Sequence, residues 1–378
     1  MQTLLATGLV LTFITIFLLF LIIEVICHNR RLNSIPTRIS ITGTRGKTTV
    51  TRLLASILRE SGHNVLAKTT GTEAKYILPD GSEQSIKRMG APNILEQKKL
   101  IRKASVLKVD FLISEIMSIQ PENHRTETQK LLKPNYTIIT NFYPDHLDAA
   151  SDKNMALLYA NDIHNNSTII IDKDDLDQEF KKSISNKKAK IITVDSAPLT
   201  LRNQHKASKL AEVFACTKEN ISAGIQKAEM DKGETRGFTL NRDESFIFIN
   251  LFAANDPISS MQIIEEIIKR PKWKNFNILG LLSLRSDRAE RSIQWLEFLK
   301  TDESKIFAGL FFTGSHRHYL NRILKKGHVI NSIDPAFITD TIVANGKSPC
   351  LVFGLANIGN TGLKLVDYWE LKGQKINL

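Results

Sequence analysis

The first 28 residues contain no lysine or arginine, and their only acidic residue is Glu24. The rest of the 378-residue chain therefore holds all 51 basic and 38 of the 39 acidic residues, a formal net charge of +13. Cysteine is scarce as well, because only Cys27, Cys216 and Cys350 occur. Their odd number and wide spacing argue against a disulfide framework and fit a reducing compartment.

Several other patterns are missing. The chain has no internal repeats, no zinc-site spacing of cysteine and histidine, and no basic motif interleaved with aromatic residues of the RNA-binding kind. With 42% hydrophobic and 24% charged residues, it is neither a disordered chain nor a multi-span membrane protein. Its length is sufficient for two or three domains.

The first 28 residues, which lack basic residues, predict a membrane anchor. Leu4 to Ile23 is a run of 20 residues without a charge, about the length that crosses a ~30 Å hydrocarbon core as a helix. A cleaved signal peptide would carry a basic start, a shorter apolar run and a cleavage site of small residues, and a buried core helix would be interrupted by polar residues. Arg30, Arg31 and Arg38 follow the run, so the positive-inside rule places the body in the cytoplasm.

A glycine-rich loop follows the anchor. Apolar residues alternate with polar ones over 38–43, as in a strand, and recur at helical spacing over 50–62, where Gly62 suits the helix end. The residues between are Gly43, Thr44, Arg45, Gly46, Lys47, Thr48 and Thr49. Strand, loop and helix are the context of a phosphate site, because backbone N–H groups and the positive helix end face the phosphates. In such a site Lys47 neutralises phosphate oxygens and Thr48 binds Mg²⁺.

The strict phosphate-loop pattern is not met, because Ile41 stands where its first glycine would fall. The loop is instead a Gly-Thr-x-Gly-Lys-Thr variant. We predict from it a site for ATP and Mg²⁺, whereas the loop alone does not identify the reaction.

Four apolar segments further along predict buried strands at 111–114, 136–140, 168–171 and 190–194. With helical stretches between several of them, they predict a parallel sheet with helices on both faces. Functional groups gather at the carboxyl ends of such strands. Glu115 follows the first strand and would complete Mg²⁺ coordination beside Thr48. Asn141 and His146 follow the second, in a segment that fits either a second metal site or a polar, helix-capping loop.

These segments resemble the Mur ligase family of ATP-dependent amide-forming enzymes, which includes folylpolyglutamate synthase. The resemblance rests on residues 41–49 (ITGTRGKTT) and 140–148 (TNFYPDHLD). Further segments and the apolar head are similar to the membrane-anchored ATP-binding subunits of poly-γ-glutamate synthetases, the CapB/PgsB type. Those segments are 68–74, 90–98, 252–256, 285–288 and 354–359. The resemblance extends from residue 36 to about residue 362.

The resemblance implies roles for individual residues. Lys47 would contact the nucleotide phosphates, Asn141 would lie against the nucleotide, Thr48 and Glu115 would hold Mg²⁺, and His146 would bind a second Mg²⁺. In the last domain, the nucleotide-binding residues would be Arg236, Asn255 and Asp256, with Arg285 and Arg288 at the reaction centre. Phe252 departs from the family pattern, because other members often have a ribose-binding acid there. The family's carbamylated lysine has no equivalent that we can place.

The predicted architecture is α/β throughout. Residues 1–28 form the transmembrane anchor, 29–240 a phosphate-loop ATPase domain with a parallel-rich sheet, and 241–378 a smaller, Rossmann-like domain. The last domain should contain strands and helices in alternation. We expect strands at 246–252, 277–282, 305–312 and 350–353, and helices at 258–269, 289–299, 319–325 and 362–371.

The resemblance implies an ATP-dependent ligase that joins glutamate units through an acyl phosphate, for a capsule or exopolymer. It would be a single-pass protein of the bacterial cytoplasmic membrane. Glutamate, anionic poly-γ-glutamate and small membrane subunits are the expected partners, and self-association stays open. Two alternatives remain: another Mur or folylpolyglutamate-type ligase, and a membrane-anchored NTPase that regulates polymer export. Net charge alone would also allow a nucleic-acid binder, which we rank last; the positive charge would instead attract the anionic substrate and product.

Overall fold

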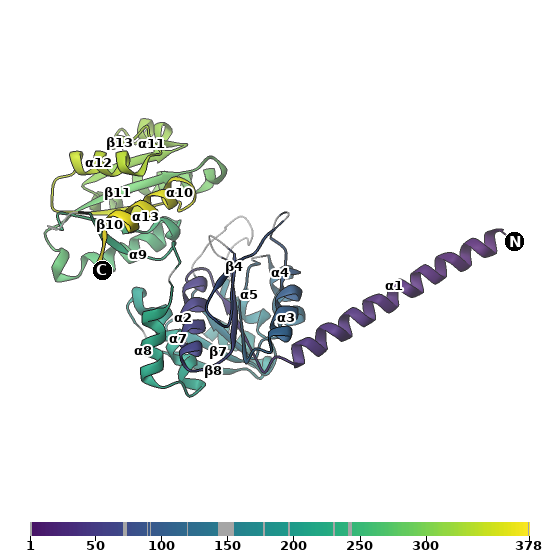
Figure 1. Ribbon diagram of the computed structural model, residues 1–378. Coiled ribbons are helices and arrows are strands. Elements are labelled where there is room, and N and C mark those ends of the chain that lie inside the picture. Colours follow the sequence, from purple (N-terminus) through teal and green to yellow (C-terminus); the bar gives the residue numbers. More distant parts are fainter. Residues whose placement is uncertain are drawn as a thin grey trace. The chain divides into compact units, whose positions relative to one another are not determined.

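The computed structural model describes residues 2–70, 74–88, 90, 92–118, 120–142, 155–176, 178–195, 197–229, 231–240, 244–376 and 378. The chain forms two compact units (Figure 1). Unit 1 comprises residues 1–196 and 204–229, and unit 2 comprises residues 197–203 and 230–378. Each unit is built around its own sheet.

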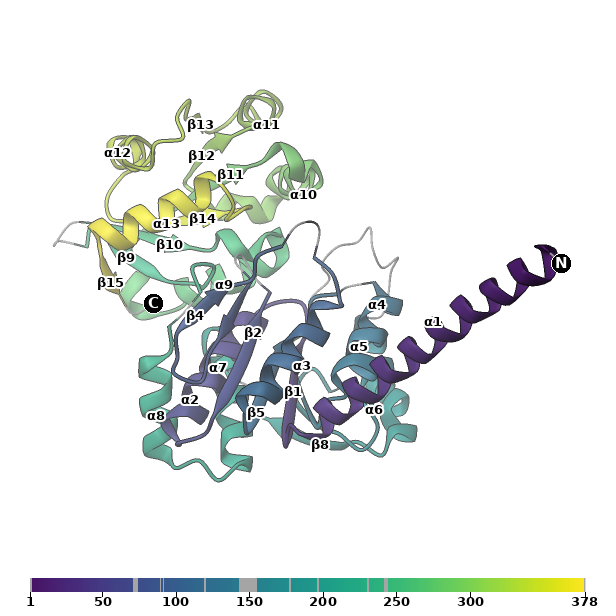
Figure 2. The same cartoon turned by 45° about the vertical axis from the view of Figure 1, so that its right-hand side comes forward.

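Unit 1 contains an eight-stranded sheet in the order β4-β3-β2-β5-β1-β6-β7-β8. Six neighbouring strands, β2 to β8 in this order, are parallel, whereas β3 and β4 form an antiparallel edge (Figure 2). The strands are β1 (Thr37–Thr42), β2 (Val65–Thr69), β3 (Lys75–Ile77), β4 (Glu83–Ser85), β5 (Phe111–Glu115), β6 (Tyr136–Ile139), β7 (Thr168–Asp172) and β8 (Lys190–Val194).

Helices cover both faces of this sheet. One face carries α3 and the π-helix η1, whose side chains share a core with β2 and β5, and also α5 and α6, which pack on β6 and β7. In both ribbon views α2, α7 and α8 lie on the opposite side of the sheet from α3. The helices are α2 (Lys47–Glu60), α3 (Glu96–Leu107), α4 (Pro121–Arg125), η1 (Thr126–Leu132), α5 (Met155–Asp162), α6 (Gln178–Ile184), η2 (Ser185–Lys187), α7 (Leu199–Val213) and α8 (Lys218–Lys227).

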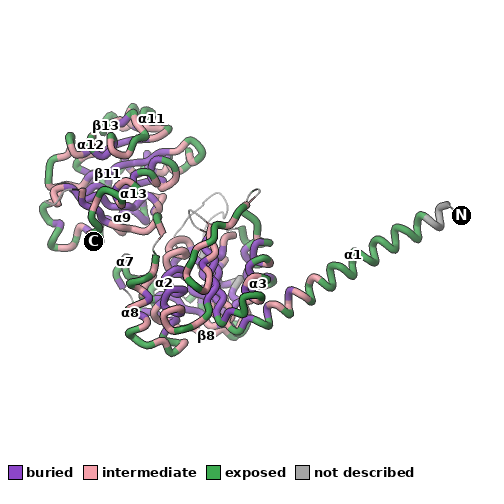
Figure 3. Tube along the Cα trace, in the orientation of Figure 1, coloured by how far each residue is buried: buried purple, intermediate pink, exposed green. Residues whose placement is uncertain are grey.

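Helix α1 (Gln2–Asn33) has two different parts. From residue 6 to residue 23 every side chain is exposed, and this stretch is long and apolar enough to cross a membrane (Figure 3). The last turns are docked onto unit 1. Glu24 pairs with Lys98 of α3 at 2.7 Å, and the His28 ring nitrogen lies 3.0 Å from the carbonyl oxygen of Leu131 in η1.

Unit 2 contains a seven-stranded sheet in the order β13-β12-β11-β14-β10-β9-β15. Its first five strands in this order are parallel, and β9 and β15 form an antiparallel edge. The strands are β9 (Gly237–Thr239), β10 (Phe246–Asn250), β11 (Asn277–Leu284), β12 (Gly309–Gly314), β13 (His328–Val329), β14 (Cys350–Leu355) and β15 (Gln374–Ile376).

The side-chain alternation of β10 and β14 builds two cores in unit 2. Ile247 and Ile249 pack with α9, α10 and α11, whereas Phe246 and Phe248 pack with α12 and α13. Both sets are buried, as expected for strands covered by helices on both faces. The helices are η3 (Phe252–Ala254), α9 (Pro257–Ile268), η4 (Pro271–Trp273), η5 (Ser286–Arg288), α10 (Ala289–Lys300), η6 (Asp302–Ile306), α11 (Arg317–Leu324), α12 (Pro335–Asn345) and α13 (Thr361–Lys372).

The predicted α/β architecture with parallel-rich sheets is confirmed. The strand, loop and helix expected around 38–62 are β1 and α2, and Gly62 has the positive φ of +85° that suits a helix end. Two bounds in unit 2 were wrong. The strand expected at 305–312 begins only at Gly309, because Lys305 and Ile306 belong to the 3₁₀ turn η6. Phe252 lies in η3, since the backbone leaves the extended region at Leu251.

A glycine in β14 gives one test of the unit 2 core. A Cβ added to Gly354 would lie 2.4 Å from the ring of Phe252, which is fully buried and stacks on Trp369. We expect Gly354→Ala to lower the free energy of unfolding by about 1–3 kcal/mol through overpacking. Urea unfolding measures this loss. Phe252→Leu in the same chain should recover part of it, and a loss that is unchanged by the smaller side chain would contradict the steric explanation.

Candidate active site

The loop after β1 passes very close to the end of β6. Gly43 has φ +118°, and a Cβ at this position would lie 2.2 Å from the hydroxyl oxygen of Thr140. The Thr140 backbone N–H donates to the carbonyl oxygen of Thr42 at 2.9 Å. Only glycine fits both this conformation and this approach. The first glycine of the predicted loop is therefore required by the contact between two strand ends.

Asn141 holds the loop from its other side. Its side-chain oxygen accepts the Arg45 backbone N–H at 3.2 Å, and its side-chain nitrogen donates to the Arg45 carbonyl oxygen at 3.0 Å. The Thr44 backbone N–H donates to the backbone carbonyl oxygen of Asn141 at 3.3 Å. This two-way contact fixes the loop backbone. The predicted contact of Asn141 with the nucleotide stays a prediction, and the structure places this residue against the loop.

Helix α2 begins directly after this loop, with Gly46 at its N-cap and Lys47 as its first residue. The Lys47 ammonium donates to the Gly43 carbonyl oxygen at 2.7 Å and to that of Thr44 at 3.3 Å, so the charge lies over the loop. The first backbone N–H groups of a helix carry partial positive charge. Lys47 and the helix end together form an electropositive site suited to phosphates. Thr49 lies in the same first turn and is half-buried.

Thr48 and Glu115 meet at the ends of α2 and β5. The Thr48 hydroxyl donates to a Glu115 carboxylate oxygen at 3.0 Å, and the same oxygen accepts the Thr70 backbone N–H at 2.8 Å. Glu115 is 3% exposed. A hydroxyl and a carboxylate that converge beside a phosphate loop are the hard oxygen donors that Mg²⁺ and related cations prefer. The residues present therefore fit a divalent cation.

The predicted second metal ligand, His146, lies outside the described residues. Within the parts of the chain that the structure describes, no group of three or more His, Cys, Asp or Glu side chains is arranged for a metal ion. A different histidine, His124, is near the loop: its ring nitrogen lies 3.0 Å from the Thr42 hydroxyl oxygen, and the ring is 2% exposed. Sequence reasoning missed His124, because nothing in the short segment 121–125 indicates that it reaches β1.

A buried ion pair lies beneath the same loop. Lys206 of α7 pairs with Asp172, the last residue of β7, and both side chains are fully buried. The Lys206 ammonium also donates to the carbonyl oxygen of Thr140. Buried ion pairs contribute little net stability, because desolvation offsets their attraction. We therefore assign this pair the role of fixing the end of β6, from which Asn141 reaches the loop. The only sequence signal was a lysine among Ala207, Leu210 and Ala211, in an apolar helical stripe.

A second buried polar cluster lies between β2 and α3. The fully buried Lys68 pairs with Glu96 at 3.1 Å, and Arg88 donates two hydrogen bonds to the same carboxylate, at 2.7 and 3.1 Å. Burial opposes ionisation of Glu96, but the hydrogen bonds from Arg88 and the charge of Lys68 outweigh it and lower its pKa from 4.5 to about 2. Lys68 and Glu96 belong to segments that carried the family resemblance. The resemblance gave them no role.

The segment after Glu115 is held by another buried carboxylate. Glu127 of η1 is 0% exposed and accepts hydrogen bonds from the Gln97 amide at 2.6 Å and from the backbone N–H groups of Met117 and Ser118 at 3.3 and 3.1 Å. A π-helical turn such as η1 is frequent at functional sites. The network therefore fixes the chain segment that directly follows Glu115.

Unit 2 has its own polar cluster at the carboxyl ends of β10, β11 and β14. Arg291 donates to the side-chain oxygens of Asn255 and Asn357 at 2.9 and 3.0 Å, and Asn357 donates to the carbonyl oxygen of Ser283 at 3.0 Å. Asn255 has φ +59°, and its carbonyl oxygen accepts the Trp295 indole N–H at 2.9 Å. Such a backbone conformation in a non-glycine residue is often found at functional sites. Sequence reasoning predicted Asn255 but missed Arg291.

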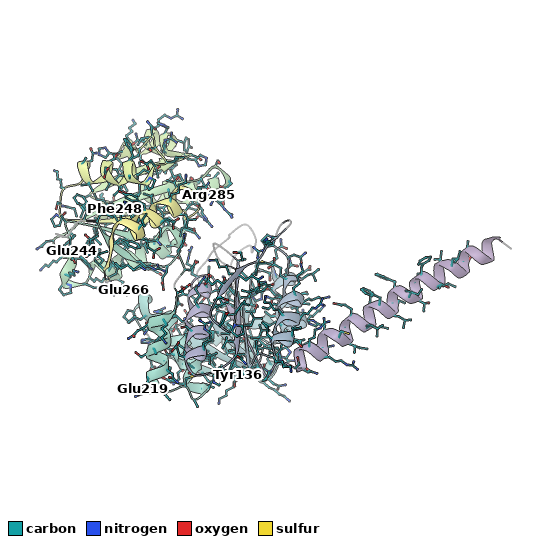
Figure 4. All side chains as sticks on the ribbon, in the orientation of Figure 1. Tyr136, Glu219, Glu244, Phe248, Glu266 and Arg285 are labelled. Carbon is teal, nitrogen blue, oxygen red and sulfur yellow. The ribbon has the colours of Figure 1, made fainter. Side chains whose placement is uncertain are left out.

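The other predicted unit 2 residues have partners within this unit. Asp256 caps α9 by accepting the Ser259 N–H at 2.8 Å. Arg285, labelled in Figure 4, donates to Asp287 at 2.9 and 2.7 Å, and Arg288 stands at the N-cap of α10. Arg236 donates to Glu370 at 3.1 Å and to the Asp231 carbonyl oxygen at 3.0 Å. Their predicted roles toward nucleotide and substrate stay predictions.

Phe252 is the residue that we expected in place of the family's ribose-binding acid, and that correspondence stays a prediction. Its side chain is fully buried and packs against Trp369 at a ring-centroid distance of 5.8 Å. This residue therefore fills the unit 2 core and offers no polar group to a ribose.

Comparison with known proteins agrees with this geometry. Residues 41–229 match the Mur ligase middle domain, and residues 236–372 match the poly-gamma-glutamate synthase CapB C-terminal domain. The chain is 32% identical to the capsule biosynthesis protein CapB of Bacillus anthracis over 74% of its own length and 64% of that protein. It is 30% identical to the PGA synthase CapB of Bacillus subtilis over 71% of its own length and 72% of that protein.

Solved structures share the fold. The bifunctional folylpolyglutamate synthase/dihydrofolate synthase of Yersinia pestis superimposes with a TM-score of 0.68 and 12% identity, covering 91% of this chain and 92% of that one. E. coli FolC gives a TM-score of 0.66 and 16% identity, covering 92% and 93%. The chain thus has the fold of these folylpolyglutamate synthases. The chain belongs to the Mur ligase family and, within it, to the CapB branch of poly-gamma-glutamate synthases.

The convergence of Thr48 and Glu115 predicts a cation-dependent nucleotide site. Glu115→Gln keeps the size of the side chain but removes the charge that a divalent cation requires. Loss of an outer-shell partner lowers the affinity of a metal site roughly 10- to 100-fold. Because Glu115 would hold the cation itself, we expect the affinity for ATP with Mg²⁺ to fall by at least this factor. Titration of a fluorescent ATP analogue with and without Mg²⁺ measures this. Glu122→Gln, an exposed change on α4, is the control. If Glu115→Gln and this control bind ATP with Mg²⁺ equally well, the assignment of Glu115 is refuted.

The Lys206–Asp172 pair predicts that stability and nucleotide affinity can be separated. Lys206→Met should cost about 3–5 kcal/mol, because Asp172 remains buried without its partner. The double variant Lys206→Met/Asp172→Leu should recover most of this stability in urea unfolding. If the pair positions Thr140 and Asn141, the KM for ATP should be about tenfold higher than in the wild-type chain in both the single and the double variant. This factor is the one typical of losing an outer-shell group. Recovery of the KM together with stability would show a purely structural role.

Proposed function

We propose that this chain is an ATP-dependent amide ligase that joins glutamate units into poly-γ-glutamate for a capsule or exopolymer. The observation that carries the proposal is the phosphate loop with Lys47 over it and Thr48 beside Glu115, in a chain of the CapB branch. Two relatives are named a capsule biosynthesis protein and a PGA synthase. The site fits activation of a carboxylate by ATP, because it gathers positive charge and oxygen ligands for a cation.

ATP and a divalent cation are the proposed cofactors, and the cation is Mg²⁺. The Yersinia pestis enzyme was solved with AMPPNP and a Mn ion, and E. coli FolC with ADP. In this chain Thr48 and Glu115 would hold the cation, with His146 as the proposed ligand of a second one. The bound cation would neutralise the phosphate oxygens and stabilise the charge that develops on them.

The first step is proposed to form an acyl phosphate. A carboxylate oxygen of glutamate attacks the γ-phosphorus of ATP, the bond from this phosphorus to the β,γ-bridging oxygen breaks, and ADP leaves. Lys47 and the N-terminal N–H groups of α2 stabilise the charge on the phosphate oxygens. Asn141 keeps the loop backbone in place while the charge moves. No Ser-His-Asp triad is required, because ATP itself activates the carboxyl group.

The second step forms the amide bond. The amine of the incoming glutamate attacks the acyl carbon, inorganic phosphate leaves, and the amine loses a proton. Negative charge builds on oxygen again in the tetrahedral intermediate, and we assign Arg285 and Arg288 to its stabilisation. In unit 2, Arg236, Asn255 and Asp256 are the residues that we propose for nucleotide contact.

We propose further that α1 anchors the chain as a single span in the bacterial cytoplasmic membrane, with the body in the cytoplasm. The length and apolar character of α1 support this location, and the basic residues Arg30 and Arg31 in its last turn support the orientation. Small membrane subunits of the synthetase are the proposed partners. Synthesis at the membrane would place the polymer next to its export route.

Lys47→Ala provides the direct test of the chemistry. We expect it to abolish glutamate-dependent release of ADP, because the loop loses the charge that meets the phosphates. Coupled-enzyme detection of ADP and gel analysis of γ-linked product measure the two parts of the reaction, with the partly exposed Lys209→Ala as a matched control. Unchanged polymer production in Lys47→Ala would refute the proposal. UDP-muramoyl peptides or folates as better acceptors would indicate another ligase, and ATP hydrolysis without any acceptor would indicate a regulatory NTPase.

A further inference from the structure

The last turns of α1 run alongside α3 in the same direction. Glu24 of α1 pairs with Lys98 near the start of α3 at 2.7 Å. Ten residues later, the Ser34 hydroxyl oxygen lies 2.8 Å from that of Ser105, near the end of α3. Lys133 adds a hydrogen bond to the Asn29 side chain at 3.0 Å. The apolar stretch of α1 is therefore not attached by a flexible tether, since its helix continues into a docked segment.

Because α1 is docked along α3, its direction determines which part of unit 1 lies nearest to a membrane that α1 crosses. The 20 residues from Leu4 to Ile23 rise about 30 Å as a helix, which matches the hydrocarbon core. Glu24 is the next residue and falls at the level of the lipid headgroups. Lys98 touches Glu24, so the first turns of α3 lie at this level as well.

The outward side of α3 at this level is basic. Gln97, Leu100, Ile101 and Ala104 are buried and form the inner stripe of the helix. Leu95, Lys99 and Arg102 recur at the spacing of one helix face and are exposed, Leu95 to 51%. Arg30 of α1 is exposed too. The exposed acid on the neighbouring α4 is Glu122, and Glu24 is already paired with Lys98.

We propose that this α3 surface, formed by Lys99 and Arg102 with Arg30 of α1, binds the headgroups of anionic lipids. The inference rests on the proposed membrane anchor and specifies how the anchored unit is held. Each basic residue near an anionic membrane contributes about 1 kcal/mol of attraction. Leu95 is an apolar side chain suited to the boundary between headgroups and acyl chains.

This contact sets the orientation of the nucleotide site. Glu96, in the first turn of α3, pairs with Lys68 near the end of β2. Two residues on, the Thr70 backbone N–H donates to Glu115. The first turn of α3 thus lies at the same sheet edge as the cation-binding pair of Thr48 and Glu115. Binding of the α3 surface to lipid would hold that edge on the membrane side of unit 1.

The test is lysine footprinting of the full chain in lipid nanodiscs. One set of discs contains phosphatidylcholine alone, and the other contains about one third phosphatidylglycerol as the anionic lipid. An amine-reactive label and mass spectrometry report Lys99 against Lys218, an exposed lysine of α8 on the other side of the sheet. We expect the labelling of Lys99 to fall roughly fivefold in the anionic discs, the factor that about 1 kcal/mol corresponds to.

Two variants sharpen this result. Arg102→Gln should restore much of the Lys99 labelling in anionic discs, whereas the charge-matched Lys209→Gln on α7 should leave it low. Equal labelling of Lys99 in both disc types, in chains that resist alkaline carbonate extraction, overturns the inference while the anchor stands. Wild-type chain released by carbonate overturns the anchor and the inference with it. Ligase activity in detergent is measured separately and reports only on the proposed chemistry.

Discussion

The nucleotide edge of unit 1 depends on how closely the end of β1 approaches the end of β6. No side chain fits at Gly43, because the Thr140 hydroxyl occupies that space. The close approach lets Asn141 reach across to both backbone groups of Arg45. It also starts α2 at the point where Lys47 and Thr48 meet the loop and Glu115. This close approach thus places the loop and the helix end, while the carboxylate comes from the neighbouring strand β5.

Buried charges reinforce this edge at positions that the loop sequence does not reveal. Lys206 with Asp172, Lys68 with Glu96, and Glu127 all lie at or beyond the carboxyl ends of the strands. Each charge has a partner or hydrogen-bond donors, which its burial requires. Such contacts are directional, unlike apolar packing, and therefore define where the strand ends lie. These groups are costly to move apart in a low-dielectric environment, so they oppose displacement of the strand ends.

The sequence was sufficient for the fold class, the loop and the family, because each depends on local pattern. Apolar alternation predicted β1, and the glycine and lysine spacing predicted the start of α2. It failed where distant segments meet. In the sequence, Lys206 is indistinguishable from an ordinary helix lysine, because its contact with the end of β6 is formed only in the fold. The role of Arg291 likewise depends on two asparagines about 36 and 66 residues away. Phe252 looked like a lost polar contact, yet it serves the unit 2 core.

Helix α1 ends at Asn33, and β1, which leads into the phosphate loop, begins at Thr37. With α1 in a bilayer, this short connection would keep the nucleotide site close to the membrane. The site could not follow the end of a growing polymer away from it. If the anchored site keeps hold of the polymer end, each addition would shift the rest of the polymer onward by one residue, and elongation would be coupled to translocation.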